Sequence, residues 1–211
     1  MADARPIRAE ELLRLAYHEA GHAVMNCLCG FGFVRGCTID PATVWAWVRD
    51  DRGSSDDEMH EMYTAQGTIL CGMTHVEDNN KSLDNAPGAV NDAYLRRAKC
   101  LIAGLCATEL LPHSEGDQDM AADDKQKLQH YVDSRTRYCQ SRGLEELLDR
   151  EPPQVFEEGV WREARADIAT NRARVERVAH ALLAAPTRTL GPDELYGLLG
   201  AIPRQPDEAE A

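Results

Sequence analysis

The stretch that decides the fold reads YHEAGHAV, residues 17–24. It places His18 and His22 four residues apart, with Glu19 directly after the first histidine and Gly21 directly before the second. Four residues make just over one turn of an α-helix, so the two imidazoles project from the same face, one above the other. Two imidazole nitrogens on one face can bind a zinc ion, and Glu19 is close enough to act on a zinc-bound water.

Gly21 indicates that this helix packs closely against a neighbour. In a helix interior glycine costs roughly 1 kcal/mol relative to alanine, so its presence indicates that another part of the chain approaches the backbone there. The pattern His-Glu-x-x-His also occurs by chance on solvated surface helices. The neighbours Ala16, Ala20, Ala23 and Val24 are small or apolar, which argues against a solvated face.

The composition limits the partners and the compartment that we expect. The chain has 211 residues, with 23 Lys and Arg against 36 Asp and Glu, and a formal net charge of −13. Nucleic acid is not expected as a partner, because phosphate recognition requires clustered cations. The seven cysteines form no CxxC pair, which indicates free thiols and a reducing, cytoplasmic setting. No signal-peptide pattern and no apolar run of transmembrane length occurs, so no membrane span is expected.

Hydrophobic periodicity predicts a mainly α-helical fold with a small β-sheet. The first helix is expected over 6–29, with the GFG at 30–32 ending it. Two short strands are predicted at 34–40 and 43–50 from their β-branched and aromatic residues. Residues 50–85 are expected to form a surface excursion, with a lid as the alternative. Further helices are predicted in four segments: 89–111, 123–140, 155–185 and from Pro192 onwards.

A third ligand is expected, because two histidines alone do not make a stable zinc site. The downstream candidates are Glu109, His113, Asp117, Asp119, Asp123 and Asp124. Glu109 lies on the next long predicted helix. Asp124 shares a helix face with the apolar Leu128 and therefore points towards the core, whereas Asp123 shares a face with Lys127, which favours solvent.

Five segments in chain order carry a family pattern: HEAGHAV at 18–24, VRGCTIDP at 34–41, AGLCATELL at 103–111, AADDKQKL at 121–128 and RVERVAHALLAAPTRTLGPDELYGLL at 174–199. Together they resemble the peptidase domain of FtsH-type ATP-dependent zinc metalloproteases. The resemblance implies that His18 and His22 are zinc ligands, that Glu19 is the catalytic base and that Asp124 is the third ligand. It also implies a zincin-like arrangement, in which the HExxH helix packs on a short sheet and a helical C-terminal part follows.

The chain departs from that pattern in several places. The family's Gly-Gly-Arg becomes Ala103-Gly104-Leu105, and its paired glutamates become Thr108-Glu109. No P-loop sequence and no membrane anchor is found, so we expect a stand-alone peptidase domain without the ATPase module. We predict a zincin-like metallopeptidase core at 1–150, a helical extension packed on it at 151–202 and a disordered tail at 203–211.

The resemblance implies a zinc-dependent endopeptidase, with Zn²⁺ as cofactor, that hydrolyses flexible or unfolded polypeptides without an ATPase of its own. The alternative is a non-catalytic metal-binding module with a regulatory or interaction role. An intact Glu19 favours the enzyme, because a purely structural zinc site needs no general base. The strand pair predicted at 34–50 would offer an edge for an extended peptide, with Trp45 and Trp47 as packing residues or substrate contacts. A homo-oligomer and a separate ATPase partner remain open.

Overall fold

The structure is a computed structural model that describes residues 8–52, 73–76, 87–112 and 118–200. It is mainly helical with one small antiparallel sheet, which confirms the predicted fold class at that level. The elements in chain order are α1 (Ala9–Leu28), β1 (Phe33–Thr38), α2 (Pro41–Arg52), β2 (Met73–Val76), α4 (Pro87–Thr108), α5 (Gln118–Ser141), α6 (Glu145–Arg150), α7 (Pro153–Thr170), α8 (Arg172–Ala184), β3 (Thr189–Leu190) and α9 (Pro192–Leu199). Most of the predicted excursion at 50–85 and the predicted tail lie outside the described residues.

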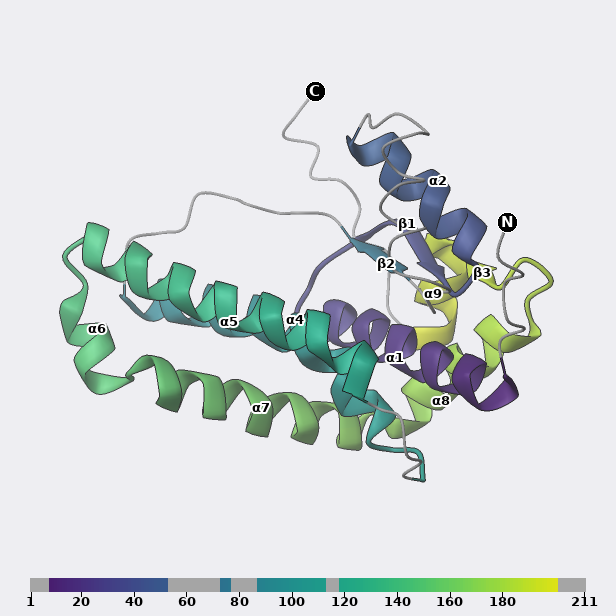
Figure 1. Ribbon diagram of the computed structural model, residues 1–211. Helices are drawn as coiled ribbons and strands as arrows, with labels where there is room; N and C mark the ends of the chain where they lie inside the picture. Colours follow the sequence, from purple (N-terminus) through teal and green to yellow (C-terminus); the bar gives the residue numbers. More distant parts are fainter. Residues whose placement is uncertain (1–7, 53–72, 77–86, 113–117, 201–211) are drawn as a thin grey trace.

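The helix that carries the HEAGH motif packs mainly against α4 and α8. Figure 1 shows α4, α5 and α7 as long neighbouring helices, with α1 beside α4 and α8 and the sheet on the other side of α1. Buried residues of α1, α4, α7 and α8 belong to one hydrophobic core, among them Val24, Ile102, Ile168 and Leu182. The C-terminal helices at 153–184 therefore share their core with the motif helix. None of the described helices is long and apolar enough to cross a membrane.

The strand β1 lies in the middle of the sheet. It pairs antiparallel with β2 on one side and with β3 on the other. The sequence predicts a strand at 34–40, close to β1, but it gives no signal for β3, which is only two residues long. Both edges of β1 carry strand partners in the described part of the chain, so β1 is not the open edge that the sequence predicts.

The second predicted strand, at 43–50, is wrong, because these residues belong to the helix α2. A cap explains the helix. Asp40 accepts hydrogen bonds at Oδ2 from the backbone nitrogen of Thr43 at 2.9 Å and from its Oγ1 at 2.7 Å. Pro41, the first residue of the helix, suits that position. Trp45 and Trp47 therefore lie on a helix and not in a hairpin, which removes the basis for a substrate contact along a strand edge.

The single long helix predicted at 155–185 is two helices, α7 and α8, which meet at Asn171. The Asn171 Nδ2 donates to the backbone oxygen of Asp167 at 2.9 Å, and its Oδ1 accepts from Arg174 at 3.0 Å. These side-chain hydrogen bonds compete with regular helical bonding, and Asn171 leaves the helical conformation with φ −102° and ψ 19°. The break lets α8 turn away from α7 and pack against α1.

Candidate metal centre

The motif lies on one continuous helix, as the spacing of its residues predicts. Residues 9–28 form α1, and nearly every residue from 15 to 26 is buried. His18 is 8% exposed and Glu19 is 4% exposed, so the motif does not form a solvated polar face. Burial of a histidine and a glutamate in adjacent positions is uncommon without partners for their polar atoms. The motif therefore has the surroundings of a functional site.

Gly21 allows α1 and α4 to cross at very short range. A Cβ atom at this position would lie 2.6 Å from the Cβ of Ala107 and would overlap the backbone oxygen of Ala103. Only glycine fits there, as the sequence indicates. The close crossing brings α4 directly against the two histidines of α1, because Gly21 immediately precedes His22.

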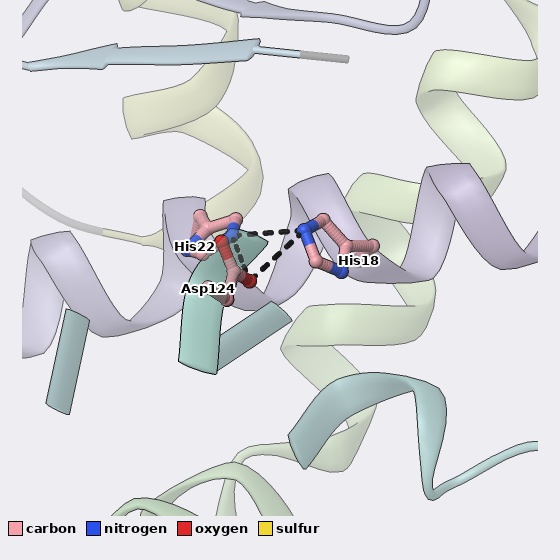
Figure 2. A group of neighbouring side chains, drawn as sticks. All are labelled: His18, His22 and Asp124. Carbon is pink, nitrogen blue, oxygen red and sulfur yellow. Dashed lines mark hydrogen bonds and ion pairs between the residues drawn. The ribbon is translucent and has the colours of Figure 1, made fainter. Parts of the chain in front are cut away.

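The helix α5 supplies the third side chain. The Oδ2 atom of Asp124 lies 3.3 Å from Nε2 of His18 and 3.4 Å from Nε2 of His22. The two Nε2 atoms are 3.1 Å apart. Figure 2 shows the three side chains pointing towards one another, two from α1 and one from α5. Their ligand atoms all lie within 4.8 Å of one another, a spacing at which they could share one metal ion.

A backbone contact fixes the orientation of the His22 ring. Its Nδ1 lies 2.8 Å from the carbonyl oxygen of Cys100 on α4. A carbonyl oxygen only accepts hydrogen bonds, so Nδ1 carries a hydrogen and the neutral ring presents the lone pair of Nε2 to Asp124 and His18. This arrangement, with one ring nitrogen bound to a carbonyl, is the usual support of a metal-ligating histidine.

Three electron-rich atoms consequently converge on one small volume. Asp124 Oδ2 is buried and accepts no hydrogen bond from the described part of the chain. Such an arrangement of a carboxylate and two imidazoles at 3.1–3.4 Å is favourable only if a proton or a cation lies between them. Two histidines and one carboxylate suit zinc with an open position, and the same donors also occur around ferrous iron.

The pKa values of His22 and Asp124 reflect this mutual attraction. Burial acts to lower the pKa of His22, but contact with Asp124 and the negative charges of Asp124 and Glu19 outweigh it and raise the pKa. Burial acts to raise the pKa of Asp124, but the two neighbouring histidines outweigh it and lower the pKa. Both shifts favour the pair of opposite charges. The centre therefore attracts positive charge, whether a proton or a metal ion supplies it.

Gly104 forms the wall of the centre on the α4 side. A Cβ atom here would lie 2.6 Å from Nδ1 and Cε1 of His18 and 2.6 Å from Nε2 of His22. The sequence places Gly104 in a run of small residues but does not indicate that it faces the histidines. The role of Cys100 has no sequence signal, because it acts through its backbone oxygen.

The other candidate ligands do not join this group. Glu109 lies on the surface beyond the end of α4, where Arg165 of α7 donates hydrogen bonds to its carboxylate at 2.8 and 2.9 Å. His113 and Asp117 fall outside the described residues, and so do the side chains of Asp119 and Asp123. Of the candidates whose side chains are described, Asp124 alone reaches the histidines.

Comparison with protein-family models and with curated proteins gives no match for this chain. The resemblance to FtsH-type peptidases stays a prediction from the sequence motifs.

Proposed function

We propose that this protein is a zinc-dependent endopeptidase, with His18, His22 and Asp124 as the metal ligands and Glu19 as the general base. The observation that supports it best is the convergence of two imidazole nitrogens and one buried carboxylate oxygen within 4.8 Å. The HExxH pattern and the packing of α1 beside a small sheet are consistent with it.

Three protein ligands are the number that catalytic zinc sites use. His18, His22 and Asp124 would hold the ion, and zinc there would supply a Lewis acid for a water molecule and for the substrate carbonyl group. Glu19 would accept a proton from the attacking water and donate it to the amine of the cleaved bond. Its burial at 4% exposure keeps its carboxylate out of bulk solvent.

The proposed substrates are flexible or unfolded polypeptides. An extended chain can reach a buried centre without an unfolding machine, whereas a folded protein cannot present its backbone. The alternative is a regulatory module that binds metal without catalysis. The presence of Glu19 beside the ligands favours the enzyme, because metal binding alone does not require it.

The test combines a measurement of zinc content with a cleavage rate on an unstructured protein such as casein, with and without a chelator. Glu19→Gln should keep zinc and lose at least about 100-fold in rate, because general acid–base catalysis contributes about 10²–10⁴-fold. Asp124→Asn should lose zinc, and Glu109→Gln, as the matched control, should keep both zinc and rate.

Two results would refute the proposal in different ways. Cleavage by Glu19→Gln at the wild-type rate would remove the proposed mechanism. Zinc-loaded wild type that cleaves no unstructured substrate would favour the regulatory module. Stoichiometric iron in the purified protein would replace zinc as the metal and require a different reaction.

A further inference from the structure

Two buried cysteine thiols lie next to the hydrogen bond that orients His22. Cys29 follows the last residue of α1, and Cys100 lies within α4. They are 7% and 5% exposed, and both are free thiols. The Cys29 Sγ donates a hydrogen bond to the backbone oxygen of Arg96 at 3.5 Å, one helical turn before Cys100. The two thiols are close enough for each to shift the pKa of the other.

Cys100 connects this pair of thiols to the candidate metal centre. The backbone oxygen of Cys100 is the acceptor for Nδ1 of His22 at 2.8 Å. A change in the position of Cys100 therefore changes the support of a proposed ligand. Cys106, six residues further along α4, is also buried.

We propose that Cys29 and Cys100 form a reversible disulfide that weakens metal binding at the neighbouring centre. The effect on metal rests on the proposed zinc site, whereas the disulfide itself does not. The motivating feature is a pair of neighbouring buried thiols: Cys29 at the end of the motif helix is bonded to the turn of α4 that leads to Cys100, and Cys100 holds His22.

The oxidant is a hydroperoxide, and hydrogen peroxide is the simplest. The sulfur of Cys29 attacks one peroxide oxygen, the O–O bond breaks, and a sulfenic acid and one water form. The sulfur of Cys100 then attacks the Cys29 sulfur, the S–O bond breaks, and a second water leaves with the thiol proton. Two thiols lose two electrons in total, and the peroxide gains them. A dithiol reductant reverses the reaction.

The surroundings favour Cys29 as the attacking thiol. The hydrogen bond from Cys100 lowers the pKa of Cys29 although burial opposes it, and the positive charge of Lys99 acts in the same direction. Lys99 is held nearby by Asp167, whose Oδ2 lies 2.8 Å from its Nζ. A thiol with a lowered pKa reacts faster with peroxide at neutral pH, because the thiolate is the nucleophile.

The disulfide should move the support of His22. It holds the two sulfurs about 2.05 Å apart and ties the end of α1 to the turn of α4 that carries the Cys100 oxygen. We therefore expect this oxygen to move relative to Nδ1 of His22. Changes to groups that support a ligating histidine cost about 10–100-fold in metal affinity, so we expect zinc affinity to fall by at least about tenfold.

The experiment uses the full chain in its reduced, metal-free form. It is treated with hydrogen peroxide, digested without reduction and mapped by mass spectrometry, and zinc affinity is measured against a chromophoric chelator before and after. We expect a peptide linking Cys29 to Cys100, weaker zinc binding, and recovery of affinity with dithiothreitol. Cys29→Ala should keep its zinc affinity after peroxide. Cys106→Ala, the matched control, should respond like wild type.

Several results would overturn this inference. They are the absence of a Cys29–Cys100 peptide, a link from Cys29 to a different cysteine, and an unchanged zinc affinity in protein shown to carry the disulfide. Cys29→Ser repeats the test with a side chain of similar size, so a misfolded alanine variant does not decide it. Reduced wild type that binds no zinc would refute the metal centre, and the peptide map would still report on the disulfide.

Discussion

Replacing Gly104 with alanine should disable the metal centre while the fold survives. The added Cβ would lie 2.6 Å from atoms of both His18 and His22, where ordinary contacts begin at 3.4 Å. Either the backbone of α4 or the two imidazole rings must move by about 0.8 Å, the difference between these two distances. The backbone of α4 has little freedom to retreat, because α5 and α7 pack against it. The imidazoles are therefore expected to move.

Two opposite effects set the cost to stability. Forcing an extra methyl group into a packed core costs about 1–3 kcal/mol. Alanine in place of glycine in a helix interior contributes about 1 kcal/mol in the other direction. The free energy of unfolding of the metal-free protein should therefore fall by about 0–2 kcal/mol. Zinc affinity should fall by about tenfold or more, because a ligand constellation tolerates displacements of only about 0.5 Å.

The assay pairs urea unfolding in the presence of a chelator with a zinc titration of the same variant. Gly197→Ala provides the matched control, because a Cβ at Gly197 of α9 meets nothing within 4 Å. This control should be as stable as wild type or more stable, and it should bind zinc normally. A Gly104→Ala protein with wild-type zinc affinity would show that zinc binding does not require the space beside Gly104. Gly104 would then not form a wall of the centre.

Two further predictions concern charge. Because the pKa of His22 is raised and that of Asp124 is lowered in the metal-free protein, their attraction contributes fully between about pH 4 and pH 6.5 and is lost as the pH rises through the pKa of His22. The loss of unfolding free energy caused by Asp124→Asn should be larger at about pH 5.5 than at about pH 8.5, and equal losses in urea titrations would contradict this. Glu151→Gln should cost about 3 kcal/mol, measured by urea unfolding, because it removes the 2.9 Å ion pair of the fully buried Arg135. A loss below about 0.5 kcal/mol would show that the other partners of Arg135 suffice.

The sequence predicts the part of the site that lies within one helix. His18, Glu19 and His22 lie close together in the chain, so helical periodicity alone places them on one buried face. Gly21 indicates that another helix packs closely there. Asp124 is a harder case. Asp124 shares a helix face with Leu128, which indicates burial. The approach of Asp124 to the histidines of α1 depends on tertiary packing, which no local sequence pattern contains. The Cys100 oxygen cannot be predicted at all, because every residue has one.

The errors in the predicted fold have local causes. The stretch TVWAWVRD has the residue types of a strand, but the Asp40-Pro41 cap starts a helix there. The break at Asn171 lies in an otherwise continuous amphipathic pattern, and a single asparagine does not identify it. The strand β3 forms because β1 offers a partner, and two residues are too few to show a period.

The proposed ligands also come from distant parts of the chain, which has a consequence for synthesis. His18 and His22 leave the ribosome about 100 residues before Asp124, a delay of about 5–20 s at ordinary rates of translation. During that interval the nascent chain has two of the three ligands, and two imidazoles on a lone helix hold zinc weakly. If the proposed centre binds a metal, loading must wait until α5 has been made and has packed on α4, so a bound ion would report that the chain has completed at least this much of its fold.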